Sequence, residues 1–269
     1  MNRNSAKHAC LIALTFALAA ALPARADEWS KTYALTSKPD LRVETSDANI
    51  RVTTWDQNSI EAKVITSRDK IGEGGIRVEE HQSGDSVTIE VRYPHHGITI
   101  DWGQHRVDII IQMPREGRVN LHTGDGKIEL SGLKGEMDLS SGDGSENLES
   151  VDGKLHAKTG DGHIRARGRF DELDVKTGDG SVEVSAASGS SLAVGWRLET
   201  GDGSVRLNIP ADLAADVDLH TSDGHIDLED ISVIAAGMIR QGELHGKLNG
   251  GGSLLTIRTG DGSIHLGKS

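Results

Sequence analysis

A four-residue motif, Thr-Gly-Asp-Gly or a close variant, recurs through the second half of this chain of 269 residues. Its aspartates are Asp125, Asp143, Asp161, Asp179, Asp202, Asp223 and Asp261. The first four follow one another at intervals of 18 residues, and the later intervals are 23, 21 and 38. The last interval is close to two periods, which predicts a degenerate copy that includes residues 246–249. Self-similarity at a short fixed period indicates a repeat architecture, in which each unit buries its apolar face only by stacking on its neighbours.

Each period divides into two nonapeptides whose sixth and eighth residues are apolar. The pairs are Ile128/Leu130, Met137/Leu139, Leu155/Ala157, Ile164/Ala166, Leu173/Val175 and Val182/Val184, and only Glu146, paired with Leu148, departs from them. This alternation predicts short strands with one face inward and the other in water. The glycines and aspartates between strands are expected to form the turns, because Gly tolerates positive φ and Asp bonds its own backbone. The histidines that alternate with apolar positions are expected to face outward; they are His122, His156, His163, His220, His225 and His265.

The same frame appears earlier in the chain, where Thr45-Ser46-Asp47 is flanked by alternating apolar residues. Between it and the obvious repeats lie candidate strands at 59–66, 75–80, 86–93 and 106–113. The sequence therefore predicts one domain over residues 27–269, with irregular coils at 27–122 and TGDG-repeat coils at 123–269.

Two folds satisfy the alternation: a parallel β-solenoid with two short strands per coil of about 18 residues, and an antiparallel meander with hairpin turns. The solenoid explains more, because only stacking requires the motif to recur in every second turn. The longer segments 186–199 and 209–220 are then expected as loops, and residues 27–40 and 266–269 as the end caps. Trp196 is expected in the core.

The N-terminus has the form of a secretory signal peptide. Arg3 and Lys7 precede an apolar run, and the small residues around Arg25 predict cleavage after Ala26. Export to the periplasm or the cell surface follows from this prediction. No later apolar stretch reaches membrane length, so no transmembrane segment is expected after cleavage.

Without residues 1–26 the chain has 26 basic and 41 acidic residues, a formal charge of −15. This charge argues against binding to nucleic acid. Aromatic residues make up only 3% of the chain, and its one cysteine, Cys10, lies within the signal peptide. A core without disulfides must therefore be thin and aliphatic.

Stacked coils would place Asp125, Asp143, Asp161 and Asp179 in a row. Such a row could attract a hard cation such as Ca²⁺, or each aspartate could instead close its own turn. A second cluster, His95, His96, Asp101 and His105, is interpreted as part of a solvated loop. The sequence contains no nucleophile elbow, P-loop or H-E-x-x-H motif, so no catalytic or cofactor-binding residues are assigned.

The frame V-x-L-x-T-G-D-G-x-I-x-L over residues 40–266 resembles a family of exported bacterial β-strand-repeat proteins known as putative adhesins, a domain of unknown function. The resemblance implies a β-helix-like solenoid without catalytic residues. The expected function is a non-catalytic adhesin or binding module of the cell envelope, with an envelope glycan, a protein or another copy of the chain as partner. The alternatives are a carbohydrate-active enzyme (a polysaccharide lyase or hydrolase) and a structural envelope protein that binds divalent cations weakly.

Overall fold

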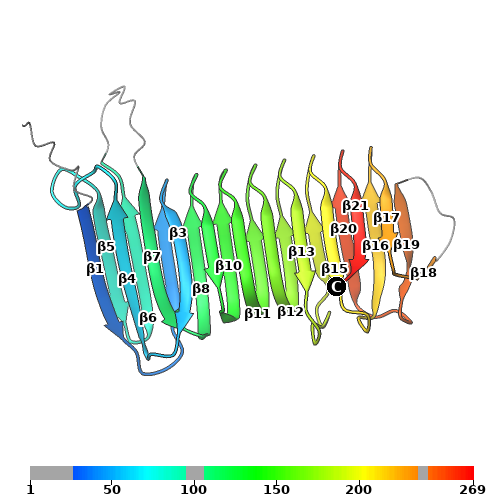
Figure 1. The fold of residues 1–269 in the computed structure, drawn as a ribbon, viewed down its shortest axis with the longest axis horizontal. Helices are drawn as coiled ribbons and strands as arrows, with labels where there is room; N and C mark the ends of the chain where they lie inside the picture. The colour runs from blue at the N-terminus through cyan, green and yellow to red at the C-terminus, as the bar shows by residue number, and fades with distance from the viewer. Residues whose placement is uncertain (1–26, 95–105, 236–241) are drawn as a thin grey trace, which may run out of the picture.

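The computed structural model describes residues 27–94, 106–235 and 242–269, and within them every regular element is a β-strand (Figure 1). The predicted all-β class is therefore confirmed. The signal peptide and the cluster of His95, His96, Asp101 and His105 lie outside the described residues. No membrane-spanning helix is found in the part of the chain that is described.

The strands are short and follow one another closely along the chain. The first ten are β1 (Asp27–Ala34), β2 (Asp40–Thr45), β3 (Asn49–Trp55), β4 (Ser59–Thr66), β5 (Arg77–Ser83), β6 (Ser86–Arg92), β7 (Val107–Pro114), β8 (Glu116–Thr123), β9 (Ile128–Ser131) and β10 (Lys134–Ser141). The others are β11 (Glu146–Lys158), β12 (Ile164–Lys176), β13 (Val182–Ala186), β14 (Trp196–Glu199), β15 (Val205–Ile209), β16 (Ala215–Thr221), β17 (Ile226–Glu229), β18 (Val233–Ala235), β19 (Glu243–Leu248), β20 (Leu254–Thr259) and β21 (Ile264–Lys268).

The strand pairings form two series that share the long strands β11 and β12. The first series runs β1-β4-β7-β3-β9-β11-β12-β13-β15-β21-β17. The second runs β5-β6-β2-β8-β10-β11-β12-β14-β20-β16-β19-β18. Pairing is parallel throughout the middle and antiparallel only at the two ends, so the described strands form one mixed sheet. We call a second-series strand, its turn and the following first-series strand a coil.

The apolar residues of the repeat are in register from one strand to the next, and their side chains lie between the two series. Ile128, Ile164, Val182 and Val205 occupy equivalent positions on β9, β12, β13 and β15 and are buried, as predicted. Trp196 is also buried, as predicted, and packs edge-on against Phe170 with ring centroids 6.3 Å apart. The core is accordingly a narrow column of aliphatic side chains with few aromatic rings.

Two coils are out of sequence order in the stack, which corrects the expectation of simple succession. The coil of residues 40–55 lies between the strands of 86–114 and those of 116–131. The coil of residues 254–268 lies between those of 196–209 and 215–229. Near the C-terminal end the chain skips the position of one coil and later returns to fill it with residues 254–268 (Figure 1). Near the N-terminal end the strands of residues 86–114 are added outside the earlier coil of residues 40–55.

The strands near the C-terminus overturn three detailed expectations. Residues 246–248 do not belong to a degenerate repeat, because β19 runs antiparallel to β16 at the end of the stack. Residues 266–268 do not form a cap, because β21 is an interior strand between β15 and β17. The segments expected as loops contain β14 and most of β16, which occupy core positions. At the other end, β1 is an edge strand within the segment expected to form the N-terminal cap.

Deleting residues 254–269 should abolish cooperative folding rather than remove one coil from an end. The deletion takes away β20 and β21 and separates the coils that they join. A shorter deletion of Lys268 and Ser269 removes little pairing and serves as the control. Thermal melts followed by far-UV circular dichroism test this. A 254–269 deletion that melts cooperatively within a few degrees of the full chain would contradict the insertion of this coil.

Among the described residues, Glu146 is the one carboxyl side chain buried in the column of apolar residues. It is 1% exposed, lies in register between Ile128 and Ile164, and neither of its side-chain oxygens has a hydrogen-bond partner among the described residues. Burial raises the pKa of Glu146 to about 8, with a further contribution from the charge of Asp138 and an opposing one from the Ser141 backbone. The folded protein therefore holds this carboxyl neutral below that pH.

The substitution Glu146→Gln should stabilise the protein increasingly as pH rises. A folded pKa above the ordinary value of 4.5 means that wild-type stability is unaffected below 4.5 and falls as pH rises toward about 8. Glutamine has no charge to bury, so its advantage should grow to about 5 kcal/mol above that range. Urea unfolding of both proteins at pH 5, 7 and 9 measures the difference, and a constant difference would contradict a buried neutral carboxyl.

Candidate functional site

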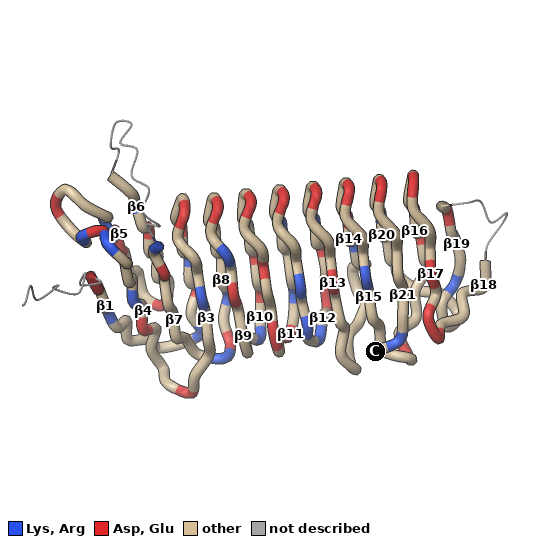
Figure 2. Tube along the Cα trace, turned by 45° about the horizontal axis from the view of Figure 1, so that its top comes forward, with Lys and Arg blue, Asp and Glu red and all other residues tan. Residues whose placement is uncertain are grey.

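Eight turns of the repeat lie side by side along one edge of the stack, and we call them the turn ladder. In spatial order they are residues 45–48, 123–126, 141–144, 159–162, 177–180, 200–203, 259–262 and 221–224. Figure 2 shows acidic residues at the tips of successive coils along this edge. The four aspartates singled out from the sequence, Asp125, Asp143, Asp161 and Asp179, therefore occupy consecutive positions in one row.

The first residue of each turn is buried, and in seven of the eight turns its hydroxyl group closes the turn. Thr159 is 2% exposed, and its Oγ1 accepts a hydrogen bond from the N–H of Gly162 at 3.3 Å. The same hydroxyl donates to the carbonyl of Gly144 in the preceding coil at 2.9 Å. Equivalent residues in the other turns are also buried: Thr45, Thr123, Ser141, Thr177, Thr200, Thr259 and Thr221. This row of hydroxyl groups joins each turn to the one before it.

The glycines of the turn ladder are needed for close approach between coils. None of them has a positive φ, contrary to the expectation from the sequence. A Cβ on Gly144 would lie 1.8 Å from the carbonyl oxygen of Gly126, and a Cβ on Gly162 would lie 2.1 Å from that of Gly144. No side chain fits at such a distance, so the fourth position must remain glycine wherever another turn precedes it.

The aspartates do not close the turns, which corrects the second expectation about them. The backbone N–H of Asp143 donates to the carbonyl of Gly124 at 3.1 Å, but its side chain points into solvent. Among the described residues, the eight carboxylates of the ladder accept no hydrogen bond and form no ion pair; the others are Asp47, Asp125, Asp161, Asp179, Asp202, Asp223 and Asp261. Asp125 Oδ1 leans over the next coil and would lie 3.7 Å from a Cβ on Gly142.

The glycine carbonyls of the turns already accept hydrogen bonds from the next coil, which bears on calcium binding. The carbonyl of Gly124 accepts hydrogen bonds from the N–H groups of Gly142 and Asp143 and from the hydroxyl of Ser141. Calcium takes six to eight oxygen ligands, often including backbone carbonyls. The glycine carbonyls are therefore not free to join the carboxylates around an ion, so the geometry favours diffuse attraction of cations over a specific calcium cage.

The outer face of the second series is balanced in charge, unlike the ladder. Glu136 forms ion pairs with Arg118 on one neighbouring strand and, at 3.7 Å, with Lys154 on the other. Lys154 also lies 3.9 Å from Glu172, so positive and negative groups alternate from coil to coil. These residues line a shallow depression of about 350 Å³.

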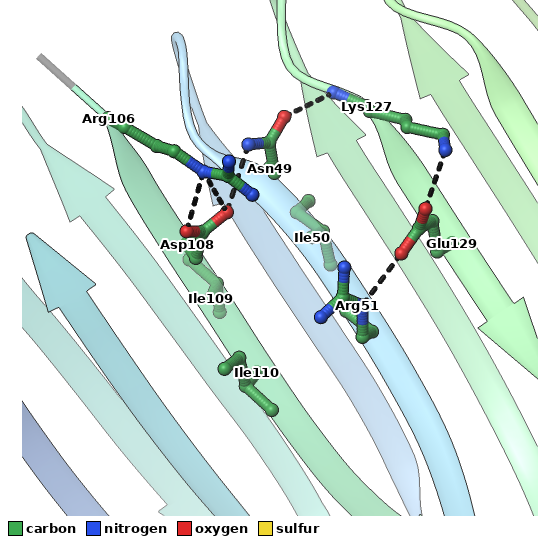
Figure 3. Close-up of a pocket in the computed structure, with 9 residues that line it drawn as sticks. All are labelled: Asn49, Ile50, Arg51, Arg106, Asp108, Ile109, Ile110, Lys127 and Glu129. Carbon is green, nitrogen blue, oxygen red and sulfur yellow. Dashed lines mark hydrogen bonds and ion pairs between the residues drawn. The ribbon is translucent and has the colours of Figure 1, made fainter. Parts of the chain in front are cut away.

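The first-series face contains a similar network around a depression of about 260 Å³ (Figure 3). Glu129 is bound by Arg51 at 2.6 Å and by Lys127 at 2.5 Å. Asp108 accepts hydrogen bonds from Asn49 at 2.9 Å and from Arg106 at 2.8 Å. The carboxylates of Glu136, Glu172, Glu129 and Asp108 thus have cationic or amide partners.

A third depression, of about 410 Å³, contains Trp55 and two carboxylates, the combination that a carbohydrate-active enzyme would use. Asp56 is paired with Arg115 at 2.8 Å, and Glu116 with Lys38 at 2.8 Å. The hydrogen bond from Lys38 lowers the pKa of Glu116, whereas a general acid needs a raised one. This arrangement gives no support to glycosidic-bond cleavage at the depression.

The described residues include one cluster of possible metal ligands that the sequence did not predict. His225 and Asp227 on one coil meet His265 on the inserted coil, and their ligand atoms lie within 4.8 Å of one another. The two histidines were predicted only to face outward, and His265 is indeed half-buried on the outer face. The sequence did offer one indication of this cluster: His225 and Asp227 are two residues apart, which places both side chains on one face of a strand.

The fold and the turn ladder together define the class of protein. It is an all-β repeat protein whose coils contain glycine turns and carry a row of exposed aspartates. The chain belongs to the Toastrack DUF4097 family, which its sequence matches over residues 36–216. None of the curated proteins is similar to it.

Several solved bacterial structures are similar in shape and distant in sequence. A "putative cell adhesion protein" from Clostridium sporogenes is 13% identical, with a TM-score of 0.45, over 91% of this chain and 100% of the other. A "putative adhesin" from Bacteroides fragilis is 9% identical, with a TM-score of 0.47, over 89% and 96%. A "putative lipid binding protein" from Parabacteroides distasonis is 11% identical, with a TM-score of 0.36, over 89% and 96%.

Substitutions within a single turn should separate the roles of threonine and aspartate. Thr123→Val removes the hydroxyl that accepts from the Gly126 N–H and donates to the Ala48 carbonyl, leaving both groups buried without partners. The expected loss of stability is about 1–3 kcal/mol. Asp125→Asn should leave stability unchanged or slightly raised, because it removes only a repelling charge. Urea unfolding measures both, and the reverse order of effects would contradict turn closure by threonine.

Proposed function

We propose that this protein is an exported, non-catalytic β-solenoid that serves as a binding or adhesive module of the bacterial cell envelope. The turn ladder is its binding surface. The observation that carries the proposal is the contrast between the ladder, whose exposed carboxylates lack ion-pair partners among the described residues, and the two faces, on which networks of ion pairs run from strand to strand. Export rests on the signal-peptide pattern of residues 1–26.

The solenoid description is supported by the parallel pairing of equivalent strands in the middle of the chain. Residues one period apart, such as Met137 and Leu155, are direct partners on neighbouring strands. The ladder therefore repeats at the distance between adjacent strands, about 4.8 Å. Its carboxylates sit on short side chains above turns fixed by hydrogen bonds, so little conformational entropy is lost when a partner binds them.

The chemistry of the ladder favours a polymer with repeated cationic groups. An envelope glycan with amines or bound divalent cations, or a protein with a row of basic side chains, would match a line of carboxylates. A second copy of the chain would meet this edge with the same charge, so self-association through two ladders is disfavoured. Attraction of this kind weakens with ionic strength.

An array of envelope glycans and proteins, probed at low ionic strength, tests the proposal with two matched variants. The ladder variant carries Asp125→Asn, Asp143→Asn, Asp161→Asn and Asp179→Asn. The control variant carries Glu129→Gln, Glu136→Gln, Glu149→Gln and Glu183→Gln, which removes the same charge from the faces. Wild type and control are expected to bind the same component, and the ladder variant should lose at least about tenfold in affinity.

Two results would contradict this function. Equal binding by both variants would exclude the ladder as the binding surface. The absence of any binding across the array by wild-type protein, at low ionic strength with and without divalent cations, would remove the support for a binding module of the envelope.

A further inference from the structure

The strongest unassigned site lies on the outer face of the first series, near the C-terminal end of the stack. Asp227 Oδ2 is 3.0 Å from His225 Nε2 and 3.1 Å from His265 Nδ1. The carboxylate therefore lies between two imidazole rings, whose planes are nearly perpendicular with centroids 5.9 Å apart. His225 is exposed, and the other two residues are half-buried.

Strand register explains why these three side chains meet. Asp227 on β17 is the direct partner of His265 on β21, so the two side chains project from the same face. His225 precedes Asp227 by two residues and shares that face. The cluster exists only because the coil of residues 254–268 is inserted beside the coil of residues 215–229.

The spacing of the three donor atoms suits a small transition-metal ion. Zinc binds histidine nitrogen and carboxylate oxygen at about 2.0–2.2 Å, so tetrahedral ligands lie about 3.3–3.5 Å from one another. The two separations from Asp227 Oδ2 are only a few tenths of an ångström shorter, and the third pair lies within 4.8 Å. Two imidazoles with one carboxylate favour zinc-like metals, whereas oxygen-only sites favour calcium or magnesium.

The surroundings of the cluster orient one ring and place charges of both signs near it. Ser263 Oγ lies 2.8 Å from His225 Nδ1, the contact through which an outer residue fixes the ring of a metal-binding histidine. Glu229 follows on the same strand, with its carboxylate beside Gly267. Arg206 on β15 is the register partner of His265 on the other side, and its positive charge opposes a dication there.

We propose that His225, Asp227 and His265 bind one divalent first-row transition-metal ion of the zinc type. Three protein ligands leave a fourth position for water or for a group from a partner. The ion links the outermost coil to the coil inserted beside it, and so it stabilises the C-terminal end of the stack. This inference does not depend on the turn ladder or on what the ladder binds.

Calorimetric titration of metal-free full-length protein with ZnCl2 at pH 7.5 tests the proposal. Wild-type protein is expected to bind one Zn²⁺ per chain, and its melting temperature should rise with Zn²⁺ because binding favours the folded state. Co²⁺ in place of Zn²⁺ should give visible absorption typical of low coordination number. Asp227→Asn and His265→Ala should each weaken the binding by at least about tenfold.

His163→Ala is the matched control. His163 occupies the same place after its turn as His225, and its Nδ1 accepts a hydrogen bond from the N–H of Ser181. It is followed two residues later by Arg165 instead of an acid, so its loss should leave Zn²⁺ affinity unchanged. Melting of each metal-free variant at the wild-type temperature shows that its fold is intact. Absence of one-to-one binding by wild type, or equal affinity in Asp227→Asn, would overturn the proposal and leave an ion-pair cluster only.

Discussion

The close approach of one turn to the next is the constraint on which the rest of the structure depends. The N–H of Gly142 lies 2.5 Å from the carbonyl oxygen of Gly124, and the same contact recurs up the stack. The first turn of the ladder, residues 45–48, has no ladder turn before it, so this constraint does not apply there. It accordingly has Ser46 and Ala48 in place of glycines. The last turn has Ser222, and its N–H lies farther from the neighbouring carbonyl, at 2.9 Å. Replacements of the two glycines therefore mark the two ends of the ladder.

Much of the fold could be predicted because alternation of apolar residues fixes which face of each strand is buried. The strand expected at 59–66 is β4, residue for residue, and the paired apolar positions of the central repeats are buried. Leu228 follows the same frame and is 37% exposed, because β17 is the last strand of its series. The order of the coils could not be predicted. Every copy presents nearly the same apolar pair and the same turn, so any copy can stack on any other.

The candidate site was predicted in position and misread in mechanism. Threonine and aspartate can both accept hydrogen bonds from backbone N–H groups nearby, so the motif alone does not say which one closes the turn. The deciding signal is the strand alternation: Thr123 follows the buried Leu121 by two residues and thus points inward, where its hydroxyl meets the N–H of Gly126. The strand ends at Thr123, so the alternation does not extend to Asp125, which is exposed. The His225–Asp227–His265 cluster could not be found in this way. Its members meet only through the coil order, which the repeat does not encode.

Insertion of a late coil changes how the ends of such a stack are held. In a simple succession the outermost coil contacts one neighbour, and stability is close to a sum over adjacent units. Here the strands of the outermost coil, β17 and β16, pair with β21 and β20, which come from the end of the sequence. The outer coil therefore cannot complete its pairing until the last residues are in place.

The N-terminal end of the stack follows the same plan, since the coil of residues 40–55 is enclosed by strands that come later in the chain. Both ends thus depend on contacts distant in sequence, which makes fraying coil by coil costly. The continuous row of carboxylates requires this closure, because its last turns, 259–262 and 221–224, adjoin only when the chain has returned.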